Sequence, residues 1–379
     1  MIAGGTYEPV PHIRGSNRSR WALPGALALV AISLAPATAS SSTIAVARPP
    51  ARHVFLINLE NKGFDTTFGA GSAAPYLSVT LRGQGALLTQ YWGTAHNSLP
   101  NYIAQISGQG PNPQTQGDCQ VYSPFEGAGT VAPQQAVGQG CVYPATVSTV
   151  ADQLDGAHLT WKTYQEDMAT PCSHPAIGAV DDTQQATAAS QYAVRHNPFV
   201  YFHSIIDTPR CAERDLPLTR LPSDLATVAS TANLTTITPD LCSDAHDSPC
   251  ADGRPGGLVS ADAFLQTWVP KILASPAYRR DGVLIVTFDE SDSPQSDSGA
   301  CCGEGPGPNS PLPGIGGMGG GRVGAVVLSR WISPGSTSTT PYNHYGLLRT
   351  IEDLFGLPYL GYAGDSGVHS FGRDVFTHL

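Results

Sequence analysis

The stretch Gly282-Val-Leu-Ile-Val-Thr-Phe-Asp-Glu290 is a short apolar run that ends in two adjacent acids. An uninterrupted run of this kind is typical of a strand that is buried on both faces of a parallel sheet. A second run, His53-Val-Phe-Leu-Ile-Asn-Leu-Glu60, has the same form and continues into Asn61. The two runs therefore predict two buried strands, each of which ends in polar residues.

The rest of the chain contains further predicted strands and helices. Further strands are predicted at residues 159–164, 235–238 and 323–329, and helices at residues 98–106, 146–154, 261–273 and 344–355. Strands that alternate with helices imply an α/β fold with a mostly parallel central sheet, flanked by helices on both faces. Ligands of such folds bind at the carboxyl ends of the strands. Glu60-Asn61 and Asp289-Glu290 are therefore expected to share one site.

The N-terminus has the composition of an export signal. Three Arg residues precede an uncharged, mostly apolar stretch at residues 21–34, and Ala37-Thr-Ala39 has the small-x-small pattern of a cleavage site. The apolar stretch is shorter than the roughly 20 residues that a membrane-spanning helix needs. We predict a signal peptide over residues 1–39, with a tethering anchor as the alternative. The protein would then be secreted or extracytoplasmic, without a stable membrane span after cleavage.

The rest of the chain, residues 40–379, is predicted to form a single domain. Residues 109–145 and 291–321 are rich in Gly, Pro and small polar residues, and we expect them to be loop excursions over the sheet edge. The eight Cys residues fit an oxidising compartment. Their order suggests the local pairs Cys119–Cys141, Cys172–Cys211 and Cys242–Cys250, but order alone does not fix connectivity. Cys301 and Cys302 would bridge each other, stay free or pair elsewhere.

Charge excludes one class of partner. The chain has 30 acidic and 20 basic residues, and removal of residues 1–39 would make its net charge of −10 more negative still. Nucleic acid recruits basic surfaces, so none is expected as a partner. An anionic substrate would need local positive charge, which a divalent cation would provide.

Two acidic pairs and one Ser carry the candidate chemistry. Asp289-Glu290 and Glu60-Asn61 stand at strand ends, where adjacent carboxylates are costly unless a cation neutralises them. A solvated strand end is the alternative. Ser98 precedes Pro100 at a predicted helix start, where a Ser usually caps the helix. The free N–H groups there also suit a phosphate, and a hydroxyl that binds a metal becomes a nucleophile.

Polar residues near Ser98 add candidates. Asn101, one turn further on, could donate its amide to a phosphoryl oxygen, and His96 would be a proton carrier or a loop residue. Asp244-Ala-His246-Asp247 places one imidazole between carboxylates, which suits a metal site or a polar loop closed by the neighbouring Cys pair.

The remaining histidines of interest are isolated in the sequence. His196 precedes an aromatic run, and His344 opens the last predicted helix. An isolated His is more often structural than catalytic. The sequence contains no P-loop, HExxH or GxSxG motif. From the residues alone we therefore predict metal-assisted hydrolysis of an anionic ester.

A series of short motifs follows in one order along the chain. They are Leu59-Glu-Asn-Lys62, Ala95-His-Asn-Ser-Leu-Pro-Asn-Tyr102, Tyr164-Gln-Glu-Asp-Met168, Arg195-His-Asn-Pro-Phe199, Pro239-Asp240 with Asp244-Ala-His-Asp247, Val286-Thr-Phe-Asp-Glu290 and His344-Tyr-Gly-Leu-Leu348. The series resembles the bacterial phosphoesterase family of secreted acid phosphatases and phospholipases C, which belongs to the alkaline phosphatase-like superfamily. The resemblance extends from residue 52 to the C-terminus and implies an alkaline phosphatase-like fold.

The resemblance also implies a cofactor, a divalent metal cation whose identity the sequence leaves open. The ligands that it implies for this metal are Glu60, Asn61, Ser98, Asp289 and Glu290. A second metal would have ligands that match the superfamily's chain order, namely Asp244, His246 and His344.

Catalytic roles follow from the same resemblance. Ser98 would attack phosphorus and form a phosphoserine that water then hydrolyses. Asn101 would bind a phosphoryl oxygen, with His96 as a further substrate contact. His196 and His344 are the remaining catalytic candidates, and His196 would contact the phosphate or protonate the leaving group.

The predicted function is thus an exported, metal-dependent phosphomonoesterase of the acid phosphatase type. A phospholipase C-type phosphodiesterase is one alternative, and a disulfide-stapled extracellular binding protein is another. The expected partner is a phosphorylated small molecule or a phospholipid head group. The sequence leaves the oligomeric state open.

Overall fold

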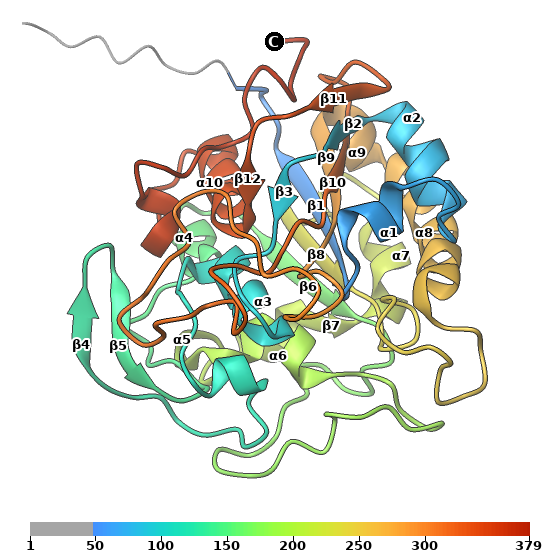
Figure 1. The fold of residues 1–379 in the computed structure, drawn as a ribbon. Helices are drawn as coiled ribbons and strands as arrows, with labels where there is room; N and C mark the ends of the chain where they lie inside the picture. The colour runs from blue at the N-terminus through green and yellow to red at the C-terminus, as the bar shows by residue number, and fades with distance from the viewer. Residues whose placement is uncertain (1–47) are drawn as a thin grey trace, which may run out of the picture. The chain divides into compact units, whose positions relative to one another are not determined.

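The computed structural model describes residues 48–379, and the predicted signal peptide lies outside them. An eight-stranded sheet runs through the middle of this part of the chain (Figure 1). In spatial order its strands are β11 (Ser336–Ser338), β2 (Ala86–Leu88), β10 (Ala325–Ser329), β9 (Gly282–Phe288), β1 (His53–Leu59), β8 (Leu234–Thr238), β6 (Trp161–Gln165) and β7 (Asp215–Pro217). The strands from β9 to β7 are parallel, and β10 is antiparallel to both β9 and β2. The prediction of an α/β fold around a mostly parallel sheet is confirmed.

Strands β1 and β9 form the centre of the sheet. All seven residues of each strand are buried, as their uninterrupted apolar runs predict. Their register pairs Leu59 with Phe288. The next residue of each strand, Glu60 and Asp289, therefore emerges beside the other at the same point of the sheet edge.

Helices cover both faces of the sheet, as predicted (Figure 1). One face carries α3 (Ser98–Ser107), α4 (Val150–Gly156) and α10 (His344–Phe355), and the other carries α1 (Phe64–Phe68), α8 (Gly257–Ala274) and α9 (Pro276–Asp281). Shorter helices are α2 (Arg82–Gln84), α5 (His203–Ile206), α6 (Arg210–Arg214) and α7 (Leu221–Asp224).

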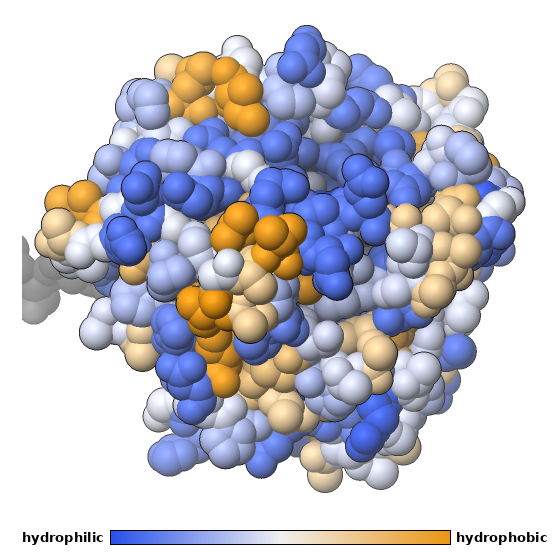
Figure 2. All heavy atoms as spheres, turned by 90° about the horizontal axis from the view of Figure 1, so that it is seen from below, coloured by the Kyte–Doolittle hydropathy of each residue, from blue (hydrophilic) through white to orange (hydrophobic). Residues whose placement is uncertain are grey.

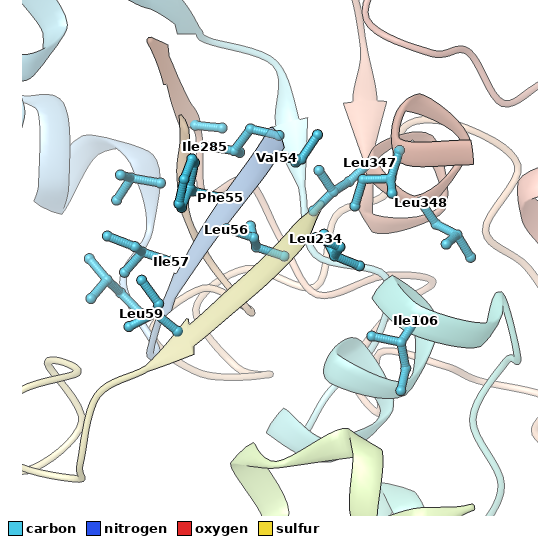
Figure 3. Packing of buried hydrophobic residues seen from close by; sticks show 14 of the residues in the cluster. Val54, Phe55, Leu56, Ile57, Leu59, Ile106, Leu234, Ile285, Leu347 and Leu348 are labelled. Atoms are coloured by element: carbon cyan, nitrogen blue, oxygen red, sulfur yellow. The ribbon is translucent and has the colours of Figure 1, made fainter. Parts of the chain in front are cut away.

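The side chains of β1 alternate between the two layers of helices (Figure 3). Phe55, Ile57 and Leu59 point toward the side of α1, whereas Val54 and Leu56 point toward α3 and α10. This alternation joins both layers to one buried core, because successive side chains of a strand face opposite ways. The core holds the ends of β1 and β9, and hence the site, in place.

Some boundaries differ from the predictions. Helix α4 begins at Val150 because Thr149 and Asp152 form a reciprocal capping box there. The excursion at 109–145 contains a hairpin, β4 (Glu126–Val131) and β5 (Gln135–Gln139), where the composition predicts only loop. Residues 291–321, all of them described, contain no helix or strand. A short parallel ladder of β3 (Tyr91–Trp92) and β12 (Tyr342–Asn343) leads into α3 and α10.

Disulfides close several loops. The predicted pairs Cys119–Cys141, Cys172–Cys211 and Cys242–Cys250 are present, and Cys301 bridges Cys302. Such bonds fit the oxidising compartment that the composition suggests. Among residues 48–379, no helix combines the length and apolar character needed to cross a membrane.

Candidate active site

Ser98 is the first residue of α3, and its hydroxyl turns away from the helix end. Asn97 occupies the N-cap position, and no side chain caps the helix there. Instead, Oγ of Ser98 donates a hydrogen bond of 2.8 Å to Oε2 of Glu60. The interpretation of Ser98 as a helix cap is therefore wrong, because its hydroxyl binds a carboxylate at the sheet edge.

Glu60 follows β1 and is fully buried. Its Oε1 accepts a hydrogen bond from the hydroxyl of Tyr102, which lies one turn after Ser98 on α3. Burial raises the pKa of Glu60 well above its ordinary value, and the nearby carboxylates of Asp289 and Asp244 raise it further. An ionised Glu60 therefore needs a nearby cation as well as its two hydroxyl donors.

Asp289 follows β9 and contacts the other strand end. Its Oδ1 accepts a hydrogen bond of 3.0 Å from the backbone N–H of Asn61, which lies in the left-handed region at φ +53°. Asn adopts this conformation more readily than most residues. Burial raises the pKa of Asp289 to about 6, and its Oδ2 has no hydrogen-bond partner among the described residues.

His196 lies between Glu60 and Asp244. Its Nε2 is 3.4 Å from Oε2 of Glu60, and its Nδ1 is 3.3 Å from Oδ2 of Asp244. The ring stacks on Tyr102 with centroids 5.4 Å apart. Neither ring nitrogen has a hydrogen-bond partner among residues 48–379. Glu60, His196 and Asp244 each offer one ligand atom within 4.8 Å of the others, so they form a compact donor set.

His246 lies nearer to solvent than His196. The backbone N–H of His246 donates to Oδ1 of Asp244, and its Nδ1 is 2.7 Å from Oδ1 of Asp247. Its ring centroid is 6.2 Å from that of His196, and a third of its side chain is exposed. His246 therefore belongs to the edge of the site.

His344 is buried behind Asp289. Its Nε2 donates to the backbone carbonyl of Asp289 at 2.5 Å, and its Nδ1 accepts a hydrogen bond of 2.9 Å from the hydroxyl of Tyr91. Burial lowers the pKa of His344 to about 4. Both ring nitrogens are thus engaged. The structure groups Asp244 with His196 and does not bring His344 into that donor set.

His96 and Glu290 form a separate buried pair. Nδ1 of His96 is 2.5 Å from Oε2 of Glu290, and its Nε2 donates to the carbonyl of Asp297 at 3.0 Å. Burial lowers the pKa of His96 and raises that of Glu290. Glu290 thus lies beside the loop before Ser98, where His96 is its immediate neighbour.

Asn101 shapes the loop that carries Ser98. Its Oδ1 accepts hydrogen bonds from the backbone N–H groups of Thr94 and Ala95, and its Nδ2 donates to the carbonyls of Ala95 and Asn97. A contact between Asn101 and a phosphoryl oxygen would require one of the Nδ2 bonds to open.

The sequence alone assigns no role to three residues at the site. Tyr102 binds Glu60, and Asp118 accepts a hydrogen bond of 2.9 Å from the N–H of Leu99 at the start of α3. Arg195 is buried, and its Nη1 donates to backbone carbonyls, 3.0 Å from that of Gln184. Tyr102 could have been found, because residues four apart share one face of a helix.

Arg195 supplies buried positive charge. Among the described residues its guanidinium has backbone carbonyls as its hydrogen-bond partners and forms no ion pair. Burial raises the pKa of Asp118 and lowers the pKa of His196 and of His246; the charge of Arg195 opposes the first shift and adds to the other two.

The donor atoms fit a divalent cation. Oδ2 of Asp244, Oδ2 of Asp289 and both ring nitrogens of His196 lack hydrogen-bond partners among residues 48–379. Buried polar atoms are normally satisfied, and buried carboxylates are costly unless paired or bound to a metal. Carboxylate oxygen and neutral imidazole nitrogen are ordinary ligands of divalent metals.

A model described as the Phosphoesterase family matches residues 70–358, which is most of the chain. The chain belongs to this family. The match supports the prediction of a hydrolase that acts on phosphoric esters.

Individual relatives are distant. A phosphate-repressible acid phosphatase of Penicillium chrysogenum is 26% identical over 281 residues, which cover 73% of this chain and 54% of the relative. A phosphatidylinositol-3-phosphatase of Mycobacterium tuberculosis is 24% identical over 319 residues, which cover 84% and 82%.

A solved structure from Vibrio parahaemolyticus, described as a protein in the alkaline phosphatase superfamily, matches with a TM-score of 0.48 and 12% identity over 83% of this chain and 70% of its own. The chain spans between 51% and 61% of the length of the first three acid phosphatase relatives.

Proposed function

We propose that the protein is an exported, metal-dependent phosphomonoesterase in which Ser98 is the nucleophile. The observation that carries this proposal is the hydrogen bond from Oγ of Ser98 to Oε2 of Glu60 at the start of α3. Membership of the Phosphoesterase family supports a phosphoric ester as the substrate, and the names of the fungal relatives favour a monoester. The disulfides support a place outside the cytoplasm.

The metal would be held where the strand ends meet. Glu60, Asn61 and Asp289 come from β1 and β9, and Ser98 comes from α3. Asp244 and His196, whose ligand atoms lie within 4.8 Å of that of Glu60, complete the donor set. A bound divalent cation would neutralise these acids, lower the pKa of a coordinated hydroxyl and offset the charge of phosphoryl oxygens. Glu290 and His246 remain candidates for a wider or second metal site, whereas both ring nitrogens of His344 are engaged by Asp289 and Tyr91.

The chain's own residues then have defined tasks. Oγ of Ser98 bonds to phosphorus while the bond from phosphorus to the leaving oxygen breaks, Oε2 of Glu60 receives the Ser98 proton, and the leaving oxygen takes a proton from solvent. Water then attacks phosphorus, the bond to Oγ breaks, inorganic phosphate leaves and Oγ recovers its proton from Glu60. Tyr102 fixes the orientation of Glu60. The buried Arg195, which forms no ion pair among the described residues, would provide positive charge for the phosphoryl group. Burial lowers the pKa of His196 and keeps it neutral, which favours a ligand role over proton donation.

One pair of variants on the same helix tests the nucleophile. Ser98→Ala should abolish hydrolysis of a chromogenic phosphomonoester. When a reaction with a phosphomonoester that is labelled in its phosphoryl group is quenched in acid, this variant should carry no label. Ser107→Ala is the matched control, because Ser107 is also buried on α3 but its hydroxyl donates to the carbonyl of Ile103. Turnover that survives in Ser98→Ala would refute the role of Ser98.

A second experiment tests the metal and the ester class. Chelation should stop hydrolysis, and addition of single divalent metals should restore it. Parallel assays with a phosphomonoester and a phosphodiester of the same chromophore separate phosphatase from phospholipase C chemistry. Undiminished turnover after complete metal removal would contradict the proposed cofactor.

A further inference from the structure

Exposed hydrophobic side chains gather in neighbouring surface segments. Ten large hydrophobic side chains are exposed among residues 48–379, and six of them lie in these segments, each between 38% and 71% exposed. We call these six the apolar rim: Val121, Ile177, Val180, Leu312, Ile315 and Met318. Seen from below, the molecule shows hydrophobic side chains near the middle of its face (Figure 2). Single exposed apolar residues are ordinary, whereas a cluster marks a contact surface.

One half of the rim is tied to the start of α3 through Asp118. Val121 and Val180 pair in an antiparallel bridge, which holds the segment of Ile177 beside that of Val121. Three residues before Val121, the carboxylate of Asp118 accepts the hydrogen bond from Leu99. This half is therefore anchored, through Asp118, to the residue that follows Ser98.

The other half is tied to the residues just before Ser98. The backbone N–H of His96 donates to the carbonyl of Pro313 at 3.1 Å. The side chain of Gln116 donates to the carbonyls of Leu312 and Pro313, while its own carbonyl accepts from Nδ2 of Asn97. Both halves of the rim thus belong to segments that are hydrogen-bonded to the turn that carries the nucleophile.

Charge indicates what the rim contacts. Residues 168–180 and 305–321 contain no Asp, Glu, Lys or Arg, although the chain has a net charge of −10. Uncharged loops with apolar tips suit the interface of a lipid bilayer. The exposed Asp182 follows Val180 closely and would oppose an anionic surface. The fitting occupant is therefore a zwitterionic lipid surface.

Ile315 shows that the fold holds an apolar side chain outward at a cost. Its φ is +59°, a region that a β-branched residue rarely adopts. Glycine, which stands on either side at positions 314 and 316, is the ordinary residue for such a backbone conformation. A residue whose only role was to turn the chain would be Gly or Asn here.

We propose that the apolar rim docks on a zwitterionic lipid membrane and presents the Ser98 site to phosphorylated head groups. This inference rests on the proposed function, because it places the phosphoester substrate at a lipid surface.

Vesicle co-sedimentation tests docking without turnover. Phosphatidylcholine vesicles are the probe, and all variants carry Ser98→Ala so that lipid is not hydrolysed. Ile315→Asn and Val180→Asn should each weaken partition about tenfold or more, because binding scales with buried apolar area. Asn tolerates the backbone conformation of position 315. The matched control is Val79→Asn, at a position 69% exposed and outside the rim, which should bind like the parent.

A second assay uses the active chain. Ile315→Asn should keep its kcat/KM for a soluble phosphomonoester and lose turnover of phosphatidic acid in phosphatidylcholine vesicles. Added anionic lipid should weaken docking. No vesicle binding by the parent, or equal losses in Val79→Asn, would overturn the inference. Self-association that Ile315→Asn abolishes, without vesicle binding, would assign the rim to a second copy and also overturn it. If the active chain does not hydrolyse the soluble phosphomonoester, this result contradicts the proposed function but not the docking on lipid.

Discussion

Tyr102→Phe would remove one hydroxyl from the site and leave its packing unchanged. The hydroxyl donates to Oε1 of Glu60, while the ring stacks on His196 at a centroid distance of 5.4 Å and an interplanar angle of 13°. Phe keeps the ring and loses the hydrogen bond. The substitution therefore isolates the effect of the donor on the carboxylate that binds Ser98.

The expected magnitude follows from the type of bond. A hydrogen bond to a charged group contributes about 1.5–3 kcal/mol, and loss of a partner that orients a metal ligand typically costs about 10–100-fold in affinity or activity. We expect kcat/KM and metal affinity to fall within that range. The bond from Tyr102 also lowers the pKa of Glu60. Its loss raises that pKa, so the acidic limb of the pH–rate profile should move to higher pH.

Steady-state kinetics across pH and metal titration of the apo-protein measure these effects. Tyr143→Phe is the control, because Tyr143 is equally buried and its hydroxyl accepts a hydrogen bond of 3.2 Å from Asn112. That variant should lose stability without a shift of the profile. If Tyr102→Phe keeps the wild-type kcat/KM, metal affinity and acidic limb, the assignment of Glu60 as the centre of the site fails.

Three further predictions test other parts of the structure. Arg195→Met should raise KM for a phosphomonoester about tenfold with little change in kcat, because the guanidinium would attract the phosphoryl group equally in the bound substrate and in the transition state. An unchanged KM would contradict this. Burial raises the pKa of Glu352 to about 8, so the folded state holds its proton longer than the unfolded chain, and stability should fall as pH rises from about 4.5 to about 8. Denaturant titration should find a flatter pH dependence in Glu352→Gln, and an identical slope would refute the assignment. Replacing Cys172 and Cys211 by Ala should lower the free energy of unfolding by about 2–4 kcal/mol, measured by the same titration, whereas no loss would show that the bridge does not stabilise the fold.

The central strands could be predicted because their signal is local. A strand buried on both faces must be apolar throughout, so the runs before Glu60 and Asp289 mark β1 and β9. The three-residue strands β2, β7 and β11 show no such signal, since three residues are too few to show a period. Their place is decided by pairing with neighbours distant in sequence, which no local pattern records.

Some residues of the site could likewise be predicted from local sequence, and others could not. The acids at the strand ends follow from topology, but the contact of His196 with Glu60 and Asp244 does not. His196 ends a single 3₁₀ turn, Val194–His196, and its ring stacks on Tyr102, a contact between residues distant in sequence. The resemblance to the superfamily groups His246 and His344 with Asp244, whereas the structure engages both nitrogens of His344 elsewhere.

The geometry of α3 gives the strongest reason to assign chemistry to Ser98. Ser98 and Tyr102 are four residues apart, so their side chains point to one face of the helix. Both hydroxyls donate to the same carboxylate, one to each oxygen of Glu60. A purely structural acid would not need a hydroxyl at the helix start, where Asn97 already occupies the cap position. Two donors converge on a buried acid beside the unpartnered oxygens of Asp289 and Asp244. This arrangement leaves negative charge in excess, and a bound cation is what would balance it.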